Sequence, residues 1–103
     1  MSMSVIKNIL QESKQHYLDV KRKIDKKLSS LPHGSVKERK ISGKNYYYLQ
    51  YREGKKVRQQ YLGKSKPEAL IKQLQEKKLL KRERLKVHEA LKLLKRSEGK
   101  KRD

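Results

Sequence analysis

The sequence predicts an α+β fold: an N-terminal helix, a three-stranded antiparallel β-meander and a long C-terminal helix with a basic tail. Three observations lead to this prediction. Apolar residues recur at helical spacing through the first thirty residues, and glycines separate β-prone segments in the middle of the chain. A helix-start signal then precedes a long stretch of helix-forming residues.

The first helix is expected over residues 4–30. Its narrow apolar stripe contains residues seven apart and two more between them: Leu10, Tyr17, Ile24, Leu31, Val20 and Leu28. The other faces are charged, which is typical of a surface helix. Pro32 disfavours helical geometry at the residue before it, so we expect an N-terminal amphipathic helical segment over 1–31.

Three β-strands are expected near 36–41, 45–51 and 56–62, because Val, Ile and Tyr lie there between glycines. The first turn, within ISGKN, has three options: a two-residue turn at Ser42-Gly43, another at Gly43-Lys44, or a three-residue loop. Either two-residue turn places the same basic and aromatic residues side by side on one face: Lys37, Arg39, Ile41, Tyr46 and Tyr48.

The second turn decides which side chains of the second hairpin share a face. A three-residue loop of Arg52, Glu53 and Gly54, with Gly54 in the left-handed conformation, would collect the apolar side chains on one face. That face would hold Tyr47, Leu49, Tyr51, Val57 and Tyr61. The other face would hold Tyr46, Tyr48, Gln50, Arg52, Lys56, Arg58 and Gln60. Because strand register normally keeps the apolar set together, we expect this loop.

A second helix is expected to begin after Ser65 and to run to about Arg96. Ser65 fits an N-cap, Pro67 suits the first turn, and Glu68 stands where a capping box places its acid. The apolar stripe of this helix is expected from Leu70, Ile71, Leu74, Leu80, Val87, Leu91 and Leu94. Residues 97–103 are expected to form a disordered basic tail.

The composition restricts the class of partner. Of the 103 residues, 40% are charged and 33% are hydrophobic, so only a small core is expected. The net charge of +19 favours nucleic acid first, an anionic membrane second and an acidic protein third. No apolar stretch resembles a membrane span or a secretory signal, so we expect a cytoplasmic protein, associated with the nucleoid or other nucleic acid, and no membrane partner. Cysteine is absent, which excludes disulfides and thiolate metal sites.

The basic face of the second hairpin is the expected binding site. Cations suit phosphates, Arg and Gln can hydrogen-bond to base edges, and Tyr can stack on a base or bond to a phosphate. A solvated sheet face is the competing interpretation, which the net charge disfavours. We expect nucleic-acid contacts from Arg39, Tyr46, Tyr48, Gln50, Arg52, Lys56, Arg58, Gln60, Lys64, Lys78 and Arg82. The meander and second helix, residues 35–96, would then form a nucleic-acid-binding domain.

Residues 35–76, SVKERKISGKNYYYLQYREGKKVRQQYLGKSKPEALIKQLQE, resemble the small N-terminal DNA-binding domain of tyrosine-recombinase integrases. The shared features are a strand with alternating aromatics, a glycine turn, a basic strand and a helix start at Lys66, Glu68 and Ala69. The stretch also resembles small basic proteins with a YYYLQYREGKKV…YLGK core. In the integrase domains one sheet face packs on a helix and the other enters the major groove. The resemblance implies a reader of duplex DNA linked to mobile elements.

No catalytic, metal or cofactor site is expected. His16, His33 and His88 lie far apart in the chain and match no metal motif. The eleven carboxylates are scattered, and most have a Lys or Arg at helical spacing, which predicts solvated pairs. We therefore expect a non-enzymatic nucleic-acid binder, with duplex DNA favoured. The alternatives are an RNA or ribonucleoprotein binder, and an antitoxin-type or inhibitor-type module that covers the nucleic-acid groove of an enzyme.

Overall fold

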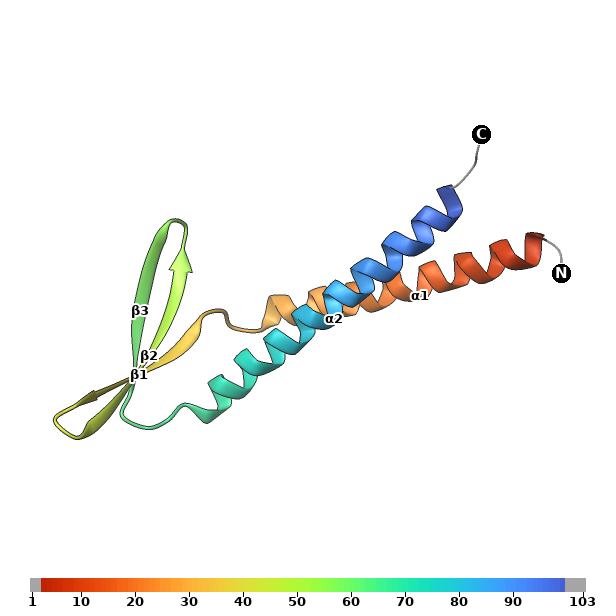
Figure 1. The fold of residues 1–103 in the computed structure, drawn as a ribbon. Coiled ribbons are helices and arrows are strands. Elements are labelled where there is room, and N and C mark those ends of the chain that lie inside the picture. The colour runs from red at the N-terminus through yellow and green to blue at the C-terminus, as the bar shows by residue number, and fades with distance from the viewer. Residues whose placement is uncertain (1–2, 100–103) are drawn as a thin grey trace. The chain divides into compact units, whose positions relative to one another are not determined.

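The computed structural model describes residues 3–99 and contains five elements (Figure 1). They are α1 (Met3–Ser30), β1 (Ser35–Ile41), β2 (Lys44–Glu53), β3 (Lys56–Gly63) and α2 (Glu68–Gly99). The strands form one antiparallel sheet in the order β1-β2-β3, so β2 is the central strand. The predicted α+β fold and the predicted order of its elements are confirmed.

The chain divides into two compact units that share α2. The sheet unit contains residues 30–78, which are the three strands and the first turns of α2. The helical unit contains α1 up to Ser29 and α2 from Leu79 onwards. The later part of α2 thus packs with α1. The expected division into segments 1–31, 35–96 and 97–103 stays a prediction.

In the sheet unit, the start of α2 covers one face of the sheet. Tyr47 on β2 and Leu74 on α2 are the buried residues of this unit, at 8% and 9% exposure. They line a hollow of about 350 Å³ together with Val36 of β1 and Ile71 of α2. The apolar contacts of the unit therefore lie between α2 and the β1–β2 half of the sheet, and the opposite face of the sheet carries no covering element of this unit.

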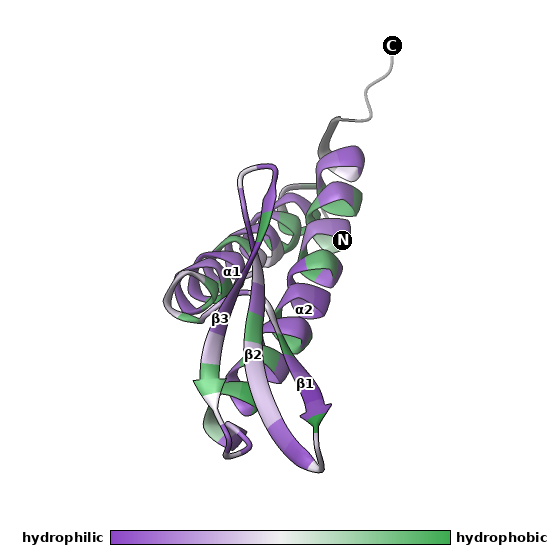
Figure 2. Cartoon of the chain, turned by 90° about the vertical axis from the view of Figure 1, so that its left-hand side faces the viewer, coloured by the Kyte–Doolittle hydropathy of each residue, from purple (hydrophilic) through white to green (hydrophobic). Residues whose placement is uncertain are grey.

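In the helical unit, α1 and the later part of α2 run in opposite directions (Figure 1). Ile24 and Val87 are buried, and the Arg84 Nε lies 2.8 Å from an Asp25 carboxylate oxygen. The stripe residues that the sequence predicted in the two helices are all at least half-buried. Hydrophilic residues nevertheless predominate on both helices (Figure 2). Within residues 3–99, neither helix contains an apolar stretch of the length needed to span a bilayer.

The start of α2 differs from the predicted start. The helix begins at Glu68, and its first helical hydrogen bond runs from the Ile71 N–H to the Pro67 carbonyl at 3.0 Å. Pro67 and not Ser65 therefore occupies the cap position, because the cap residue is the one whose carbonyl accepts that bond. At its other end α2 continues to Gly99, past the expected end at Arg96, and residues 100–103 of the expected tail lie outside the described residues.

The first hairpin uses one of the three turns considered above. Ile41 pairs with Lys44, so the turn consists of Ser42 and Gly43. Both have positive φ, 52° and 78°, as a type I′ turn requires at its two central residues. This turn places Lys37 of β1 opposite Tyr48 of β2, the strand that the two hairpins share.

The second hairpin has a different turn from the one predicted. Glu53 pairs with Lys56, so the loop is Gly54-Lys55, and the predicted three-residue loop is wrong. Gly54 does have the expected positive φ, 63°. Tyr51 consequently faces Arg58, three residues further along β3 than predicted. Because side chains alternate along a strand, this odd shift moves the side chains from Lys56 to Tyr61 to the opposite face of the sheet, up to the bulge where Tyr47 pairs with Gly63.

Candidate nucleic-acid interface

The face of the sheet opposite α2, here called the open face, is basic and aromatic. The strand register places on it Ser35, Lys37, Arg39, Ile41, Lys44, Tyr46, Tyr48, Gln50, Arg52, Val57, Gln59 and Tyr61. None of these residues is acidic. The two carboxylates of the strands, Glu38 and Glu53, both lie on the opposite face. The open face therefore carries cations and no carboxylate, whereas the opposite face carries both of the acidic residues of the strands.

Three tyrosine rings form a cluster at the centre of the open face. The Tyr61 ring centroid lies 5.4 Å from that of Tyr48 and 6.4 Å from that of Tyr46, with the rings tilted. These distances are within the range at which aromatic pairs stabilise each other. Tyr46 and Tyr48 are half-buried, and Tyr61 is 52% exposed. The cluster is an ordered platform that joins β2 to β3.

Cations lie against this cluster. The Arg39 guanidinium carbon is 5.0 Å from the Tyr48 ring centroid, and the Lys64 Nζ is 6.0 Å from that of Tyr46. Both distances permit cation–π attraction, in which the negative face of the ring attracts the cation. Lys37 adds a further charge because it lies directly opposite Tyr48 on β1. The tyrosine rings thus pack against one another and also contact the cationic side chains of Arg39 and Lys64.

A chain of hydrogen bonds crosses all three strands on the open face. The Arg39 Nη2 of β1 donates to the Gln59 Oε1 of β3 at 3.0 Å. The Gln59 Nε2 in turn donates to the Gln50 Oε1 of β2 at 3.4 Å. Arg39 and Gln59 are exposed, so the N–H groups of these two side chains that take no part in the two hydrogen bonds can reach a ligand.

The structure brings together about half of the residues predicted to contact nucleic acid. Those that lie on the open face, or next to it in the case of Lys64, are Arg39, Tyr46, Tyr48, Gln50, Arg52 and Lys64. The assignment of Lys56, Arg58 and Gln60 to this face is wrong, because the observed turn places them on the opposite face. There the Arg58 Nε lies 2.9 Å from a Glu53 carboxylate oxygen.

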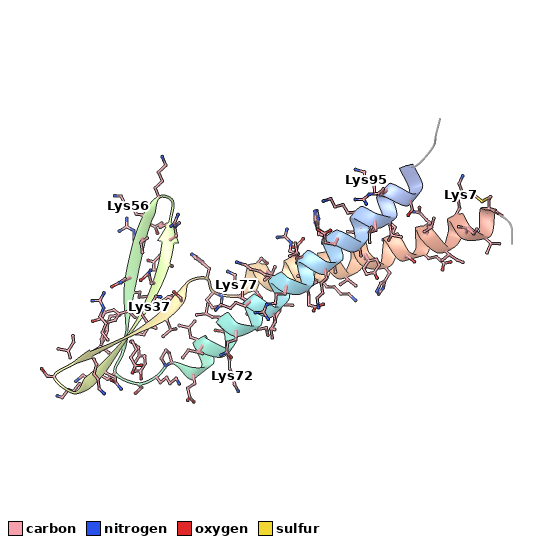
Figure 3. All side chains as sticks on the ribbon, viewed as in Figure 1. Lys7, Lys37, Lys56, Lys72, Lys77 and Lys95 are labelled. Carbon is pink, nitrogen blue, oxygen red and sulfur yellow. The ribbon has the colours of Figure 1, made fainter. Side chains whose placement is uncertain are left out.

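The two predicted helical contacts lie elsewhere. Lys78 lines the hollow between α2 and the covered face of the sheet. Arg82 is an exposed residue of the helical unit. Cationic side chains lie along every part of the described chain, for example Lys56 at the tip of the second hairpin, Lys72 on α2 and Lys7 on α1 (Figure 3). Charge alone therefore does not single out these two helical residues.

Three residues of β3 lie on the open face although the sequence predicts otherwise: it gives Gln59 no role and places Val57 and Tyr61 in the core. The alternation of these three residues along β3 is visible in the sequence. Only the turn at Gly54-Lys55 shows which half of that alternation joins the tyrosines of β2.

The helical unit contains a second basic hollow, of about 420 Å³, lined by Lys21, Lys81, Arg84, Leu85 and His88. Asp25 partly neutralises it, because its carboxylate lies 2.8 Å from Arg84 Nε and 3.6 Å from Lys21 Nζ. The open face has no such acid, so it is the stronger candidate for an anionic ligand. Within residues 3–99, no three His, Asp or Glu side chains gather closely enough to hold a metal ion.

Comparison with known proteins gives a family but no relative of known activity. No curated protein and no solved structure was found to match the chain. Residues 10–76, about two thirds of the chain, match a family described as a domain of unknown function, DUF6788. The matched span includes most of α1, the complete sheet with its open face, and the start of α2 that covers the sheet. The chain therefore belongs to the DUF6788 family.

Proposed function

We propose that this chain is a non-catalytic nucleic-acid-binding protein, associated with the nucleoid or other nucleic acid of the cytoplasm, and that duplex DNA is its favoured ligand. The observation that carries the proposal is the open face. Its cations stand without acidic neighbours around a cluster of tyrosines. A net charge of +19 adds a long-range attraction to polyphosphate, and cations that replace condensed counterions supply most of the affinity of such proteins.

The state of the tyrosine rings supports a duplex over unpaired bases. Proteins that bind single strands present aromatic side chains on which bases stack. Here Tyr48 has Arg39 over its ring and Tyr61 beside it, so this ring face is covered and does not offer a base a surface for stacking. The exposed Lys37, Arg39 and Arg52 side chains of this face add N–H donors, which match phosphates and the base edges of a paired helix.

The architecture supports the same choice. A helix covers one face of a three-stranded sheet and the other face is basic, as in the integrase domains that residues 35–76 resemble. In those domains the uncovered face enters the major groove. A link to mobile elements is part of this proposal and follows from that resemblance.

The proposal is tested by titrating the purified chain with labelled duplex DNA, duplex RNA and single-stranded DNA of equal length, with fluorescence anisotropy as the readout. We expect the duplex DNA to bind most tightly. Arg39→Ala, on the open face, should weaken duplex binding clearly more than Arg58→Ala, on the opposite face. The two variants lose the same charge, so any difference between them reports the face and not the net charge.

Two outcomes would redirect the proposal. Tighter binding to duplex RNA than to duplex DNA would support the RNA or ribonucleoprotein alternative, since the same cations serve either backbone. Absence of binding to all three ligands at low salt would reject nucleic-acid binding. The remaining candidate would then be an acidic protein surface, such as the nucleic-acid groove of an enzyme that this chain would inhibit as an antitoxin does.

A further inference from the structure

We infer that Arg39, Gln59 and Gln50 act as one unit that selects guanine in a base-paired ligand, with Gln59 as the residue that sets the selection. This inference rests on the proposed function and specifies the ligand of the same face. It is carried by the direction of the two hydrogen bonds that link these side chains across β1, β3 and β2.

The direction of these bonds follows from chemistry. An arginine side chain has only donors, so the Gln59 atom facing Arg39 at 3.0 Å must be the amide oxygen. The Gln59 amide nitrogen then faces Gln50 at 3.4 Å, so Gln50 must accept through its oxygen. The Gln50 amide nitrogen takes no part in either bond and is therefore the group that Gln50 has left to offer a ligand. Both ends of the unit, the Arg39 guanidinium and the Gln50 NH₂, present donors.

A unit that ends in donors distinguishes the bases. In the major groove guanine presents two neighbouring acceptors, N7 and O6, whereas adenine presents one acceptor and one donor. A free glutamine suits adenine, because its oxygen and nitrogen match that pair. In Gln50 one lone pair of the oxygen already accepts from Gln59. This fixes the direction of the amide and weakens its match to adenine, while its N–H donors still suit the two acceptors of guanine. Arg39 has the same preference, since bidentate arginine contacts favour guanine.

Gln59 is therefore a positioning residue. It holds Arg39 over Tyr48 through its oxygen and orients Gln50 through its nitrogen. A glutamate at this position would have acceptors on both sides. Gln50 would then have to donate to residue 59 and would turn its oxygen outward, which reverses the group that it offers to a base.

The first measurement compares the chain on two duplexes of equal length at one salt concentration, one of alternating G·C pairs and one of alternating A·T pairs. We expect a preference for the G·C duplex of about fivefold or more, the discrimination of one good base contact. A third duplex carries 7-deazaguanine in place of guanine, which removes the N7 acceptor and keeps the pairing. It should bind more weakly than the G·C duplex, because only the major-groove edge has changed.

The second measurement repeats the comparison with Gln59→Glu and with Gln60→Glu as a matched control. The two variants add the same negative charge at neighbouring exposed positions on opposite faces. Both should weaken binding to all duplexes, but only Gln59→Glu should reduce the ratio of G·C to A·T affinity severalfold. Gln59→Leu, which breaks both hydrogen bonds without adding charge, should also reduce that ratio and serves if the charged variant does not fold.

The outcomes separate this inference from the proposed function. A chain that binds no duplex overturns both. A chain that binds all duplexes with equal affinity overturns the selection of guanine and leaves the proposed function in place. A preference for G·C that survives Gln59→Glu or Gln59→Leu also overturns the inference, because the preference would then not depend on these three side chains.

Discussion

Gly34 lies directly against the carbonyl oxygen of Gln50, so closely that a Cβ added to the glycine would stand 2.5 Å from that oxygen. Such a separation is shorter than van der Waals contact allows, and the obstructing atom belongs to the backbone of the central strand. Gly34 also has a φ of 118°, a backbone angle that residues with a side chain rarely adopt. The entry into β1 therefore depends on the absence of a side chain at this position for two separate reasons.

Gly34→Ala should lower the free energy of unfolding more than Gly63→Ala does. The two glycines have nearly the same φ, 118° and 122°, but a Cβ at Gly63 would meet nothing within 4 Å. Gly63→Ala should cost about 1–3 kcal/mol from backbone strain alone. Gly34→Ala should cost at least about 1 kcal/mol more, because the strand must also move. Urea titrations of both variants measure the difference, and equal losses would contradict the close approach of Gly34 to Gln50.

Leu74→Ala should destabilise the sheet unit by about 2–5 kcal/mol, because it removes the α2 side chain that packs over the covered face of the sheet. Leu79→Ala is the matched control on the same helix. Leu79 is 58% exposed, so its replacement should change the free energy of unfolding by no more than about 0.5 kcal/mol. Thermal melts followed by circular dichroism compare the two. A silent Leu74→Ala would show that α2 does not hold the sheet.

Lys37→Ala should weaken duplex binding, whereas Lys40→Ala should have a smaller effect. Both lysines are exposed on β1, but Lys37 lies on the open face opposite Tyr48 and Lys40 on the other face opposite Asn45. If Lys37 meets a phosphate, the loss should be similar across sequences and the salt slope should fall by about 1. Anisotropy titrations at several salt concentrations measure both quantities. Equal effects of the two substitutions would mean that the ligand does not distinguish the faces.

Binding to duplex DNA should weaken steeply with salt. Each phosphate neutralised by a protein cation releases counterions, and the open face with its flanking Lys64 offers several such cations. If Lys37, Arg39, Lys44, Arg52 and Lys64 each meet one phosphate, the affinity should fall about 500-fold between roughly 50 and 200 mM salt. Titrations across that range test this directly. A nearly constant dissociation constant would reject the electrostatic mechanism.

The sequence by itself determined the elements and the two faces of the central strand. Heptad spacing in the helices follows from the geometry of a single element and needs no partner. The same holds for β2, where the period of two separates Tyr46 and Tyr48 from Tyr47 and Leu49 whatever the neighbouring strands do. The positive φ of Gly54 was also predicted, because the expected loop needs a residue in the left-handed conformation at that position, and only glycine adopts it freely.

The tertiary structure decided which face β3 shares with the tyrosines. The predicted register requires Val57 and Tyr61 to be buried, since a buried apolar face is what usually makes one register unique. In the structure α2 packs over β1 and β2, and every residue from Lys56 to Tyr61 is exposed. No buried core selects among the apolar residues of β3, so the local geometry of the Gly54-Lys55 turn sets the register instead. Local turn preferences differ too little for the sequence to show this, and it is this register that places Gln59 and Tyr61 on the open face.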